Sequence, residues 1–531
     1  MRIRTLQHIA AALGLATSLT AHAARDFTPQ AGTWIVSSEL DGKPGRGLAI
    51  DVQGNTFFMQ VFGYEKNGDA TFYTATGQMD GNGVTAPLMR YQGGRSFGGG
   101  ARDAVEDKSL GDVTVSFSNG LKGTVQFPGE PAADIERFLY NDPVFDDGVL
   151  RRLSGRSMQW FVTGEDGRPQ AWSALLHKKP DGRLALRVQS MNYVCQRDAG
   201  VQTFSCDRTA DTSAEAPSAG DFPRLRFMTA AGAVAGWVES GTLVGARLPV
   251  TGWVRASGVS TVAQVCASAD FAYFFSSQCL SQPMGSNGTW VFADELTGKP
   301  GRGVSVDAQE GVLILQVFNY LADGRPTFHM GSGSYGPYDT SFNQLALEQR
   351  GVVTLARYAG GRYLGGAAQS ATVVEGASDA GTALFVLGSG AREQPNSFFS
   401  EASLQLPYEP AKKLQRLRFD SGEPLAILRG DWYFRFQDTT GGGVELPKFF
   451  TLNQKIGSTV VSSDGRVACG LHPVNPKFYE CLLYENASRE RKLSEITFLY
   501  NGFGFMDRAI QLRDHLGNAR GVGAMEDPVE P

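Results

Sequence analysis

The chain has 531 residues, of which 42% are hydrophobic and 19% are charged, and its formal net charge is -5 at pH 7. This composition is too apolar for a disordered protein, and the slight acidic balance leaves no general basic footprint for nucleic acid or an anionic membrane surface. The length exceeds what one hydrophobic core can serve, so about three or four structural units are expected.

The start of the chain has the pattern of a secretory signal peptide. A stretch with two arginines precedes an apolar run at 9–19 and a small-x-small triplet at 21–23. Cleavage before Ala24 would take the net charge from -5 to -7. No later stretch reaches the ~18 continuous apolar residues of a membrane span. We therefore expect an exported protein, periplasmic or extracellular, without a transmembrane segment.

A long segment of the sequence occurs twice. Residues 32–77 align without gaps on residues 288–333, including the strings SELDGKPGRGLAID and DELTGKPGRGVSVD. After an insertion in the second copy, LMRYQGGRSFGG at 88–99 matches LARYAGGRYLGG at 355–366. A weaker likeness links the segments that hold the first and last cysteine pairs. We interpret the chain as two homologous halves.

Short strands are predicted within each copy. In the first copy, apolar residues alternate in GLAIDV, run almost continuously in TFFMQVFGY and return in ATFYTA, with turn clusters between them. The repeated glycine-rich string is interpreted as a turn in which Pro44 fixes φ and Lys43 and Arg46 keep the connection solvated. The expected fold is mainly β, each half being an antiparallel β-meander barrel or curved-sheet module plus a disulfide-bearing β module.

The predicted domain order is a signal peptide, a first β-barrel-like module, a first disulfide-hairpin β module, a connector, a second β-barrel-like module and a second disulfide-hairpin β module. Their bounds are 1–23, 24–130, 131–255, 256–286, 287–400 and 401–531.

Cysteine usage agrees with export. Six cysteines allow 15 pairings, but each of three close pairs encloses a turn-like stretch, so local bonds worth roughly 2 to 3 kcal/mol each are expected. The CxxC-like spacing of a zinc site is absent, and no metal site or cofactor is predicted. The expected bonds are Cys195–Cys206, Cys266–Cys279 and Cys469–Cys481.

The start of each copy carries a resemblance. A Gly-x-Trp opening, a tyrosine-glycine-aromatic hairpin and a later L-x-x-Y-x-G-G turn resemble a β-rich repeat of secreted proteobacterial proteins. The tripeptides Gly32-Thr33-Trp34 and Gly288-Thr289-Trp290 are also similar to the first strand of calycin barrels such as lipocalins and avidins. These resemblances imply an up-and-down barrel or a strongly curved sheet, with any ligand site in its mouth.

Two groups of polar residues are candidates for ligand binding. Gln60 interrupts an apolar strand on the same face as Tyr64, and its buried amide would bond either a ligand or the backbone of a closing turn. The arginines of the RYxGGRxxGG strings would either clamp a carboxylate or phosphate or stay solvated in their turns. With the second copies included, the candidate ligand-binding residues are Gln60, Tyr64, Arg90, Arg95, Gln316, Tyr320, Arg357 and Arg362.

Catalytic motifs are weak in comparison. GRSFG around Ser96 fits the Gly-x-Ser-x-Gly pattern, but its copy carries Tyr363 instead of serine. His329, which replaces Tyr73 of the first copy, is expected on the surface or in a hairpin. Two carboxylates flank each glycine-rich turn, either as the acid/base pair of a glycosidase or in surface salt bridges with the turn arginines. These carboxylates are Glu39, Asp51, Glu295 and Asp307.

The function expected from the sequence is an exported, non-catalytic binding or envelope-structural protein made of duplicated β modules. Its partner is an unknown small molecule, glycan or protein and not a nucleic acid. The alternatives are a secreted hydrolase of glycosidase type and an inhibitor or chaperone that acts through its loops. No catalytic residue is predicted.

Overall fold

The computed structural model of the chain describes residues 29–526 except for short segments. These segments are 54–55, 139–155, 164–168, 180–181, 198–202, 210–221, 231–232, 244, 256–261, 266–279, 284–286, 310–311, 338–348, 388–400, 418, 420–424, 426–427, 429, 439–448, 463, 475–478, 499–509 and 515–518. The described part is mainly β, which confirms the expected fold class.

The first barrel is a closed antiparallel ring of eight strands, each paired with its neighbours in chain order. Pairing of the last strand with the first closes the ring and leaves no open sheet edge. The strands are β1 (Gly32–Val36), β2 (Gly47–Gln53), β3 (Thr56–Tyr64), β4 (Ala70–Gln78), β5 (Gly83–Gln92), β6 (Val105–Asn119), β7 (Lys122–Gln126) and β8 (Ala133–Arg137). Trp34, Met59 and Val115 are among the residues that fill its interior.

The third barrel repeats this arrangement in the segment aligned with the first. Its strands are β19 (Gly288–Phe292), β20 (Gly303–Gln309), β21 (Val312–Tyr320), β22 (Pro326–Pro337), β23 (Gln349–Ala359), β24 (Thr372–Val373), β25 (Gly381–Leu387), β26 (Glu401–Gln405) and β27 (Lys412–Arg416). Pairing of β22 with β23 closes the ring, and the short β24 adds to the edge of β23. In both barrels a short 3-10 turn follows the first strand, at Ser37–Glu39 and Ala293–Glu295.

The second and fourth barrels are closed rings of eight strands as well. The second contains β9 (Arg156–Thr163), β10 (Pro169–Lys178), β11 (Leu184–Val188), β12 (Met191–Arg197), β13 (Thr203–Arg208), β14 (Arg224–Ala230), β15 (Ala233–Glu239) and β16 (Arg247–Arg255). The fourth contains β28 (Gly430–Asp438), β29 (Phe449–Ile456), β30 (Thr459–Ser462), β31 (Val467–Leu471), β32 (Tyr479–Tyr484), β33 (Lys492–Phe498), β34 (Ile510–Asp514) and β35 (Ala519–Glu526). Between the second and third barrels, β17 (Val262–Val265) pairs with β18 (Leu280–Pro283).

The barrels extend past two of the expected domain boundaries. The boundary at 130/131 falls before β8, although β8 closes the first barrel against β1. The boundary at 400/401 likewise falls before β26 and β27, which belong to the third barrel. Sequence periodicity finds strands but does not show which ring a strand completes, because ring closure depends on pairing between distant segments.

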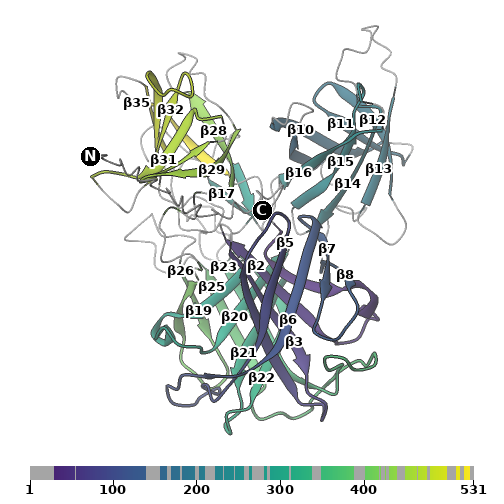
Figure 1. The fold of residues 1–531 in the computed structure, drawn as a ribbon. Coiled ribbons are helices and arrows are strands. Elements are labelled where there is room, and N and C mark those ends of the chain that lie inside the picture. Colours follow the sequence, from purple (N-terminus) through teal and green to yellow (C-terminus); the bar gives the residue numbers. More distant parts are fainter. Residues whose placement is uncertain are drawn as a thin grey trace, which may run out of the picture.

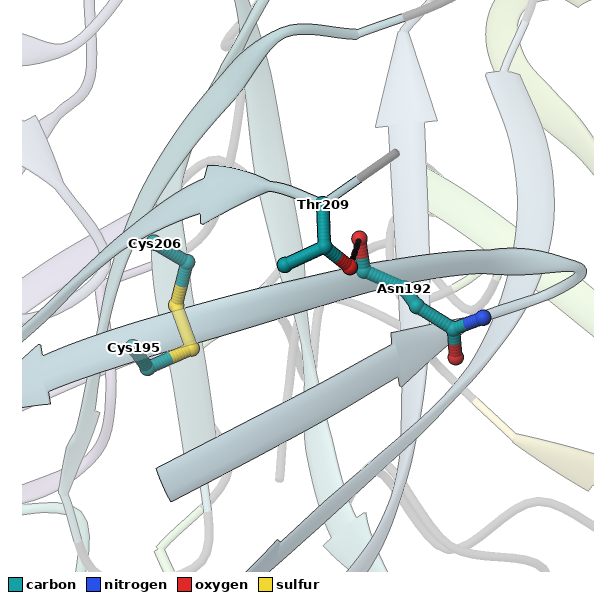
Figure 2. The surroundings of a disulfide bond; sticks show 4 residues. All are labelled: Asn192, Cys195, Cys206 and Thr209. Carbon is teal, nitrogen blue, oxygen red and sulfur yellow. Dashed lines mark hydrogen bonds between the residues drawn. A yellow bond between two sulfur atoms is a disulfide. The ribbon is translucent and has the colours of Figure 1, made fainter. Parts of the chain in front are cut away.

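Two of the expected disulfides are present. Cys195 bonds Cys206 across directly opposed positions of β12 and β13, and Thr209 donates from its backbone and its hydroxyl to the Asn192 carbonyl near the end of the same strand pair (Figure 2). Cys469 and Cys481 are joined in the same way between β31 and β32. The third expected pair, Cys266 and Cys279, lies outside the described residues.

Removal of the last disulfide is expected to weaken the fourth barrel specifically. The bond closes a loop with a sequence separation of 12, for which the chain-entropy argument gives about 3 kcal/mol. Replacing Cys469 and Cys481 by serine should therefore lower the free energy of unfolding by that amount. Hydrogen exchange in urea, followed by mass spectrometry of β31 and β32 peptides, measures it. Equal loss of protection in second-barrel peptides would contradict this prediction, because the effect would then not be specific to the fourth barrel.

The first and third barrels lie side by side (Figure 1), with β4 against β22 and β23, β1 against β20, and β2 against β19. This contact explains why β3 and β21 are apolar almost without interruption. Phe57, Met59 and Val61 point into the first barrel, whereas Phe62 and Tyr64 join a separate cluster between the barrels. Both faces of the strand are therefore buried, which removes the alternation of a half-exposed strand.

Candidate functional site at the seam of two barrels

The interface between the first and third barrels, called the seam below, has an aromatic centre. The rings of Phe62 and Phe318, at equivalent positions of the aligned segments, stack with their centroids 4.6 Å apart. Phe72 of β4 contacts Phe318 edge-on, and Phe328 of β22 contacts Phe62 edge-on, so each of these two rings reaches the opposite barrel. Aromatic pairs of this kind contribute about 0.5–1.5 kcal/mol beyond their buried area, so the seam resembles a protein core.

Buried ion pairs flank the aromatic centre. Asp307 of the third barrel accepts a hydrogen bond from the Thr33 amide at 2.8 Å and from Arg137 of the first barrel at 2.7 Å. The side chains of Arg137 and Asp307 are 0% and 1% exposed. In the reciprocal contact, Asp51 of the first barrel accepts hydrogen bonds from the Thr289 amide and from Arg416 of the third barrel. The surface pairing of these two aspartates with turn arginines, expected from the sequence, is thus wrong, because their partners come from the opposite barrel.

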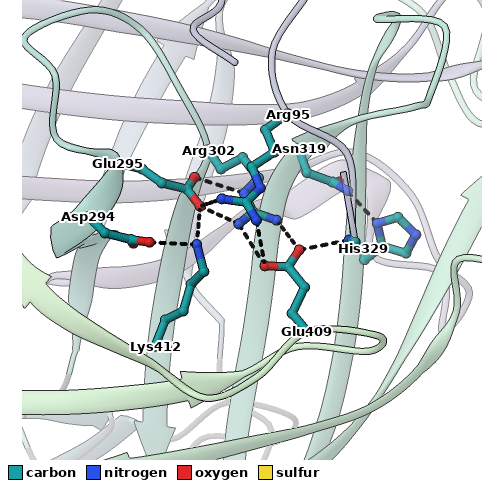
Figure 3. Close-up of polar contacts among 9 residues, drawn as sticks. Arg95, Asp294, Glu295, Arg302, Asn319, His329, Glu409 and Lys412 are labelled. Carbon is teal, nitrogen blue, oxygen red and sulfur yellow. Dashed lines mark hydrogen bonds and ion pairs between the residues drawn. The ribbon is translucent and has the colours of Figure 1, made fainter. Parts of the chain in front are cut away.

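A second polar cluster surrounds Arg302 of the glycine-rich turn (Figure 3). Arg302 is bound by Glu295 and by Glu409, the latter at 2.6 Å, and Arg95 of the first half reaches the same Glu295 at 2.9 Å. The expected glutamate–arginine pairs are present, but their arginines, Arg46 and Arg302, are buried and do not keep the turn solvated. The equivalent cluster consists of Arg46, Glu39, Glu130 and Arg362.

These clusters control the charge of the buried glutamates. Burial by itself would raise the pKa of Glu409, but the bonds from Arg302, the Gly98 amide and the charge of Arg95 lower it overall. The pKa of Glu130 is lowered in the same way, against the effect of its burial, by Arg46 and other groups of its cluster. Both glutamates are therefore ionised near neutral pH and act as charged anchors.

The two repeated GGRxxGG strings, at 93–99 and 360–366, reach across the seam. Phe97 packs against the core of the third barrel, and Leu364 packs against the core of the first. Gly94 and Gly361 make this possible, because a Cβ on either would lie 2.1 Å from the ring of Tyr320 or Tyr64, respectively. Each half thus inserts its glycine-rich loop into the other.

The four candidate arginines have protein partners. Arg90 lies 3.3 Å from Glu65 and 3.4 Å from Asp107, and Arg357 lies 3.1 Å from Asp379. The other two, Arg95 and Arg362, bind the glutamates of the opposite half as described above. Arg95 and Arg362 therefore link the two barrels, whereas Arg90 and Arg357 are paired within their own barrel.

His329 occupies a buried position, which corrects the expectation of a surface or hairpin histidine. Its Nδ1 lies 3.0 Å from Asn319 Oδ1 and its Nε2 lies 3.2 Å from Asp379 Oδ2. The ring of Phe97 covers it with the centroids 4.5 Å apart. Burial would raise the pKa of Asp379, but His329 and Arg357 lower it overall. His329 thus helps to hold the loop at 93–99 in place.

The two candidate glutamines lie on the seam face of their strands and not inside a barrel. Gln316 donates to Thr33 Oγ1 at 3.2 Å and contacts Met330 Sδ at 3.8 Å. The first copy has Thr74 at the position of Met330. The smaller side chain leaves more space beside Gln60 than Met330 leaves beside Gln316.

A cavity of about 210 Å³, the Gln60 pocket, lies in this place. Its walls include Phe58, Phe72, Tyr91 and Phe318, and residues 299–302 of the third barrel also line it. Gln60 and Tyr320 also line it. Among the described residues, neither Gln60 Oε1 nor Tyr320 Oη has a hydrogen-bond partner. Burial and the nearby Tyr91 raise the pKa of Tyr320, so its hydroxyl stays protonated.

Sequence reasoning paired Gln60 with Tyr64 of the same strand, whereas the pocket brings Gln60 together with Tyr320 of the other half. It also missed Glu130, Arg137 and their counterparts. A signal for them exists, since EPAADIER at 130–137 and EPAKKLQR at 409–416 share the same glutamate-to-arginine spacing.

Comparison with known proteins gives no further identification: no family model matches the chain, and no curated protein matches it significantly. Within the described part of the chain, no group of three or more His, Cys, Asp or Glu side chains is arranged to hold a metal ion. In the same part, no helix has the length and apolarity that a membrane crossing requires.

Proposed function

We propose that this protein is an exported, non-catalytic binding protein of duplicated origin that holds a small molecule in the Gln60 pocket. The observation that carries the proposal is a pair of buried polar atoms, Gln60 Oε1 and Tyr320 Oη, that line one cavity between two barrels and have no hydrogen-bond partner among the described residues. A buried polar atom without a partner costs about 1–3 kcal/mol, which a ligand that bonds both atoms would recover.

The pocket defines the size and polarity of this ligand. An apolar cavity of about 150 Å³ holds benzene, so a volume of about 210 Å³ suits a slightly larger one-ring molecule. The aromatic walls favour a flat body, and Gln60 Oε1 requires an N–H or O–H donor. The charged groups that line the pocket are already paired, Glu295 with Arg302 and Lys299 with Asp103. A neutral phenol or aromatic amide meets these requirements.

The carboxylates of the seam support binding over glycoside hydrolysis. A glycosidase needs one carboxyl group that is protonated near the working pH. The pKa values of Glu130 and Glu409 are instead lowered by arginine. Glu39 and Glu295 are also bound to arginines in the two clusters.

Two observations support export. The bonds Cys195–Cys206 and Cys469–Cys481 are typical of oxidising compartments outside the cytoplasm. The first 23 residues carry the pattern of a cleaved signal. N-terminal sequencing of the protein recovered from the envelope or medium tests this part, with Ala24 expected as the first residue. Uncleaved chain recovered from the cytoplasm would contradict it.

Ligand binding is tested with Gln60→Leu and the matched variant Gln316→Leu. Benzamide and phenol should raise the melting temperature of the full-length protein, and benzene should do so less. Gln60→Leu should abolish the benzamide shift without lowering the stability of the free protein, because it removes an acceptor for which the described residues supply no hydrogen-bond donor. Gln316→Leu should keep the benzamide shift and lose about 1 kcal/mol, because its bond to Thr33 is broken.

Two outcomes would contradict the proposal. One is that neither benzamide nor phenol changes the melting temperature of the unmodified protein. The other is that both variants keep an equal benzamide shift, which would place the bound molecule elsewhere. A loss of stability in Gln60→Leu as large as in Gln316→Leu would show that the Gln60 amide has a structural role.

A further inference from the structure

We propose that a second cavity at the seam binds an acidic molecule of the size of a sugar, held through a carboxylate or phosphate group. This cavity, called the Lys108 pocket below, has a volume of about 510 Å³, within the usual range for ligand sites. It lies beside the β3–β4 turn of the first barrel. The third barrel completes its walls with Arg325, Pro326 and two residues of the loop at 360–366, Tyr363 and Leu364.

Two positive charges of this pocket have no carboxylate partner in the part of the chain that the structure describes. Arg90 and Arg325 also line the pocket, but both are paired. Arg90 contacts Glu65 and Asp107, and Arg325 contacts Asp69 and Asp323. Among the described residues, neither Lys66 nor Lys108 lies within ion-pair distance of a carboxylate. Counted with these carboxylates, the charges of the pocket balance, but the two lysine charges are not taken up in ion pairs among the described residues and can attract an anion.

The inner wall offers groups that suit hydroxyls and a sugar ring. Tyr64 Oη and Thr71 Oγ1 are buried, line the pocket and have no hydrogen-bond partner among the described residues. Tyr363 provides an aromatic face, and Lys66 Nζ lies 5.8 Å from the centre of its ring. An acidic sugar can place its anionic group near the two lysines while its hydroxyls bond the two unpartnered oxygens.

Comparison of the two halves separates this site from the structural contacts of the seam. The ion-pair clusters and aromatic contacts occur in both halves. At the positions equivalent to Glu65 and Lys66, the third barrel has Leu321 and Ala322. His329 stands where the first barrel has Tyr73, and Phe97 stacks on it. The seam therefore does not need the charged lining for its own stability, and its presence in one half points to a ligand.

The test uses the full-length protein with glucuronate, glucose 6-phosphate, inorganic phosphate and glucose as probes in calorimetric titrations. Glucuronate or glucose 6-phosphate should bind, more weakly at higher salt, and glucose should not. Inorganic phosphate should bind more weakly than either, because it lacks the ring. The variant with Lys66→Ala and Lys108→Ala should lose affinity by about tenfold or more. Both lysines are exposed, so the substitution should not disturb the fold.

The controls make a negative result informative. Lys455→Ala on the fourth barrel should bind the acidic probes like the unmodified protein, and Thr71→Val should weaken glucuronate more than inorganic phosphate. Gln60→Leu should leave these affinities unchanged, which separates this site from the Gln60 pocket. The proposal is overturned if neither acidic sugar binds, if the double lysine variant binds as well as the unmodified protein, or if inorganic phosphate binds as tightly as both.

Discussion

Replacing Asp307 by alanine is expected to lower the free energy of unfolding of the paired barrels by about 3–5 kcal/mol. The reason is the position of Arg137, whose side chain is 0% exposed and whose guanidinium bonds both carboxylate oxygens of Asp307. Without the aspartate, a buried positive charge stays without its counterion. The Thr33 amide loses its acceptor in the same substitution.

Three comparisons check this result. Asp51→Ala should cost a similar amount, because Asp51 has the equivalent contacts with Arg416 and the Thr289 amide. In the fourth barrel, Glu485→Ala should cost less than about 1 kcal/mol when read on β32 peptides, since its pair with Arg491 is exposed. Replacing Arg137 by methionine together with Asp307→Ala should recover part of the loss, because it removes the unpaired charge.

Hydrogen exchange in urea, read on peptides from β3 and β21, follows the paired barrels without interference from the other two. A loss below about 1 kcal/mol for Asp307→Ala would mean that the seam opens without cost and that the barrels are not held together by these ion pairs.

Local patterns were enough to predict the strands and the fold class. The runs GLAIDV, TFFMQVFGY and ATFYTA became β2, β3 and β4, and the cysteine pair at 469 and 481 became directly opposed residues. These features depend on alternation and short loops, which the sequence shows directly. The Glu39–Arg46 pair was within reach for the same reason, because the two residues flank one turn.

The seam could not be predicted from the same patterns. An apolar run such as β3 is compatible with any strand that is buried on both faces, and the sequence does not say whether the second face meets a helix, a ligand or another barrel. Arg416 and Asp51 are separated by 365 positions, so their contact depends entirely on the relative placement of the two barrels. For the same reason the sequence pairs Gln60 with Tyr64 of its own strand and not with Tyr320.

Acidification is expected to weaken the seam. Burial would raise the pKa values of Glu130 and Glu409, but their bonds to Arg46 and Arg302 outweigh it and hold both below the ordinary value of 4.5. A carboxyl group with a lowered pKa in the folded state stabilises the protein above its ordinary pKa. That contribution disappears as the pH falls through the folded-state value. The urea midpoint of the β3 and β21 peptides should therefore be flat between about pH 7 and 5 and fall below about 4.5.

The matched variant replaces Glu130 and Glu409 by glutamine, which keeps their size but removes their charge. Its urea midpoint should be lower at pH 7, because Arg46 and Arg302 lose part of their buried counter-charge. Its further decline in acid should be shallower, since two of the groups that take up protons are gone. A decline as steep as in the unmodified protein would show that other carboxylates control the acid response. A midpoint that rises on acidification would contradict the sign of the effect, because the lowered pKa values require proton uptake to favour the unfolded state.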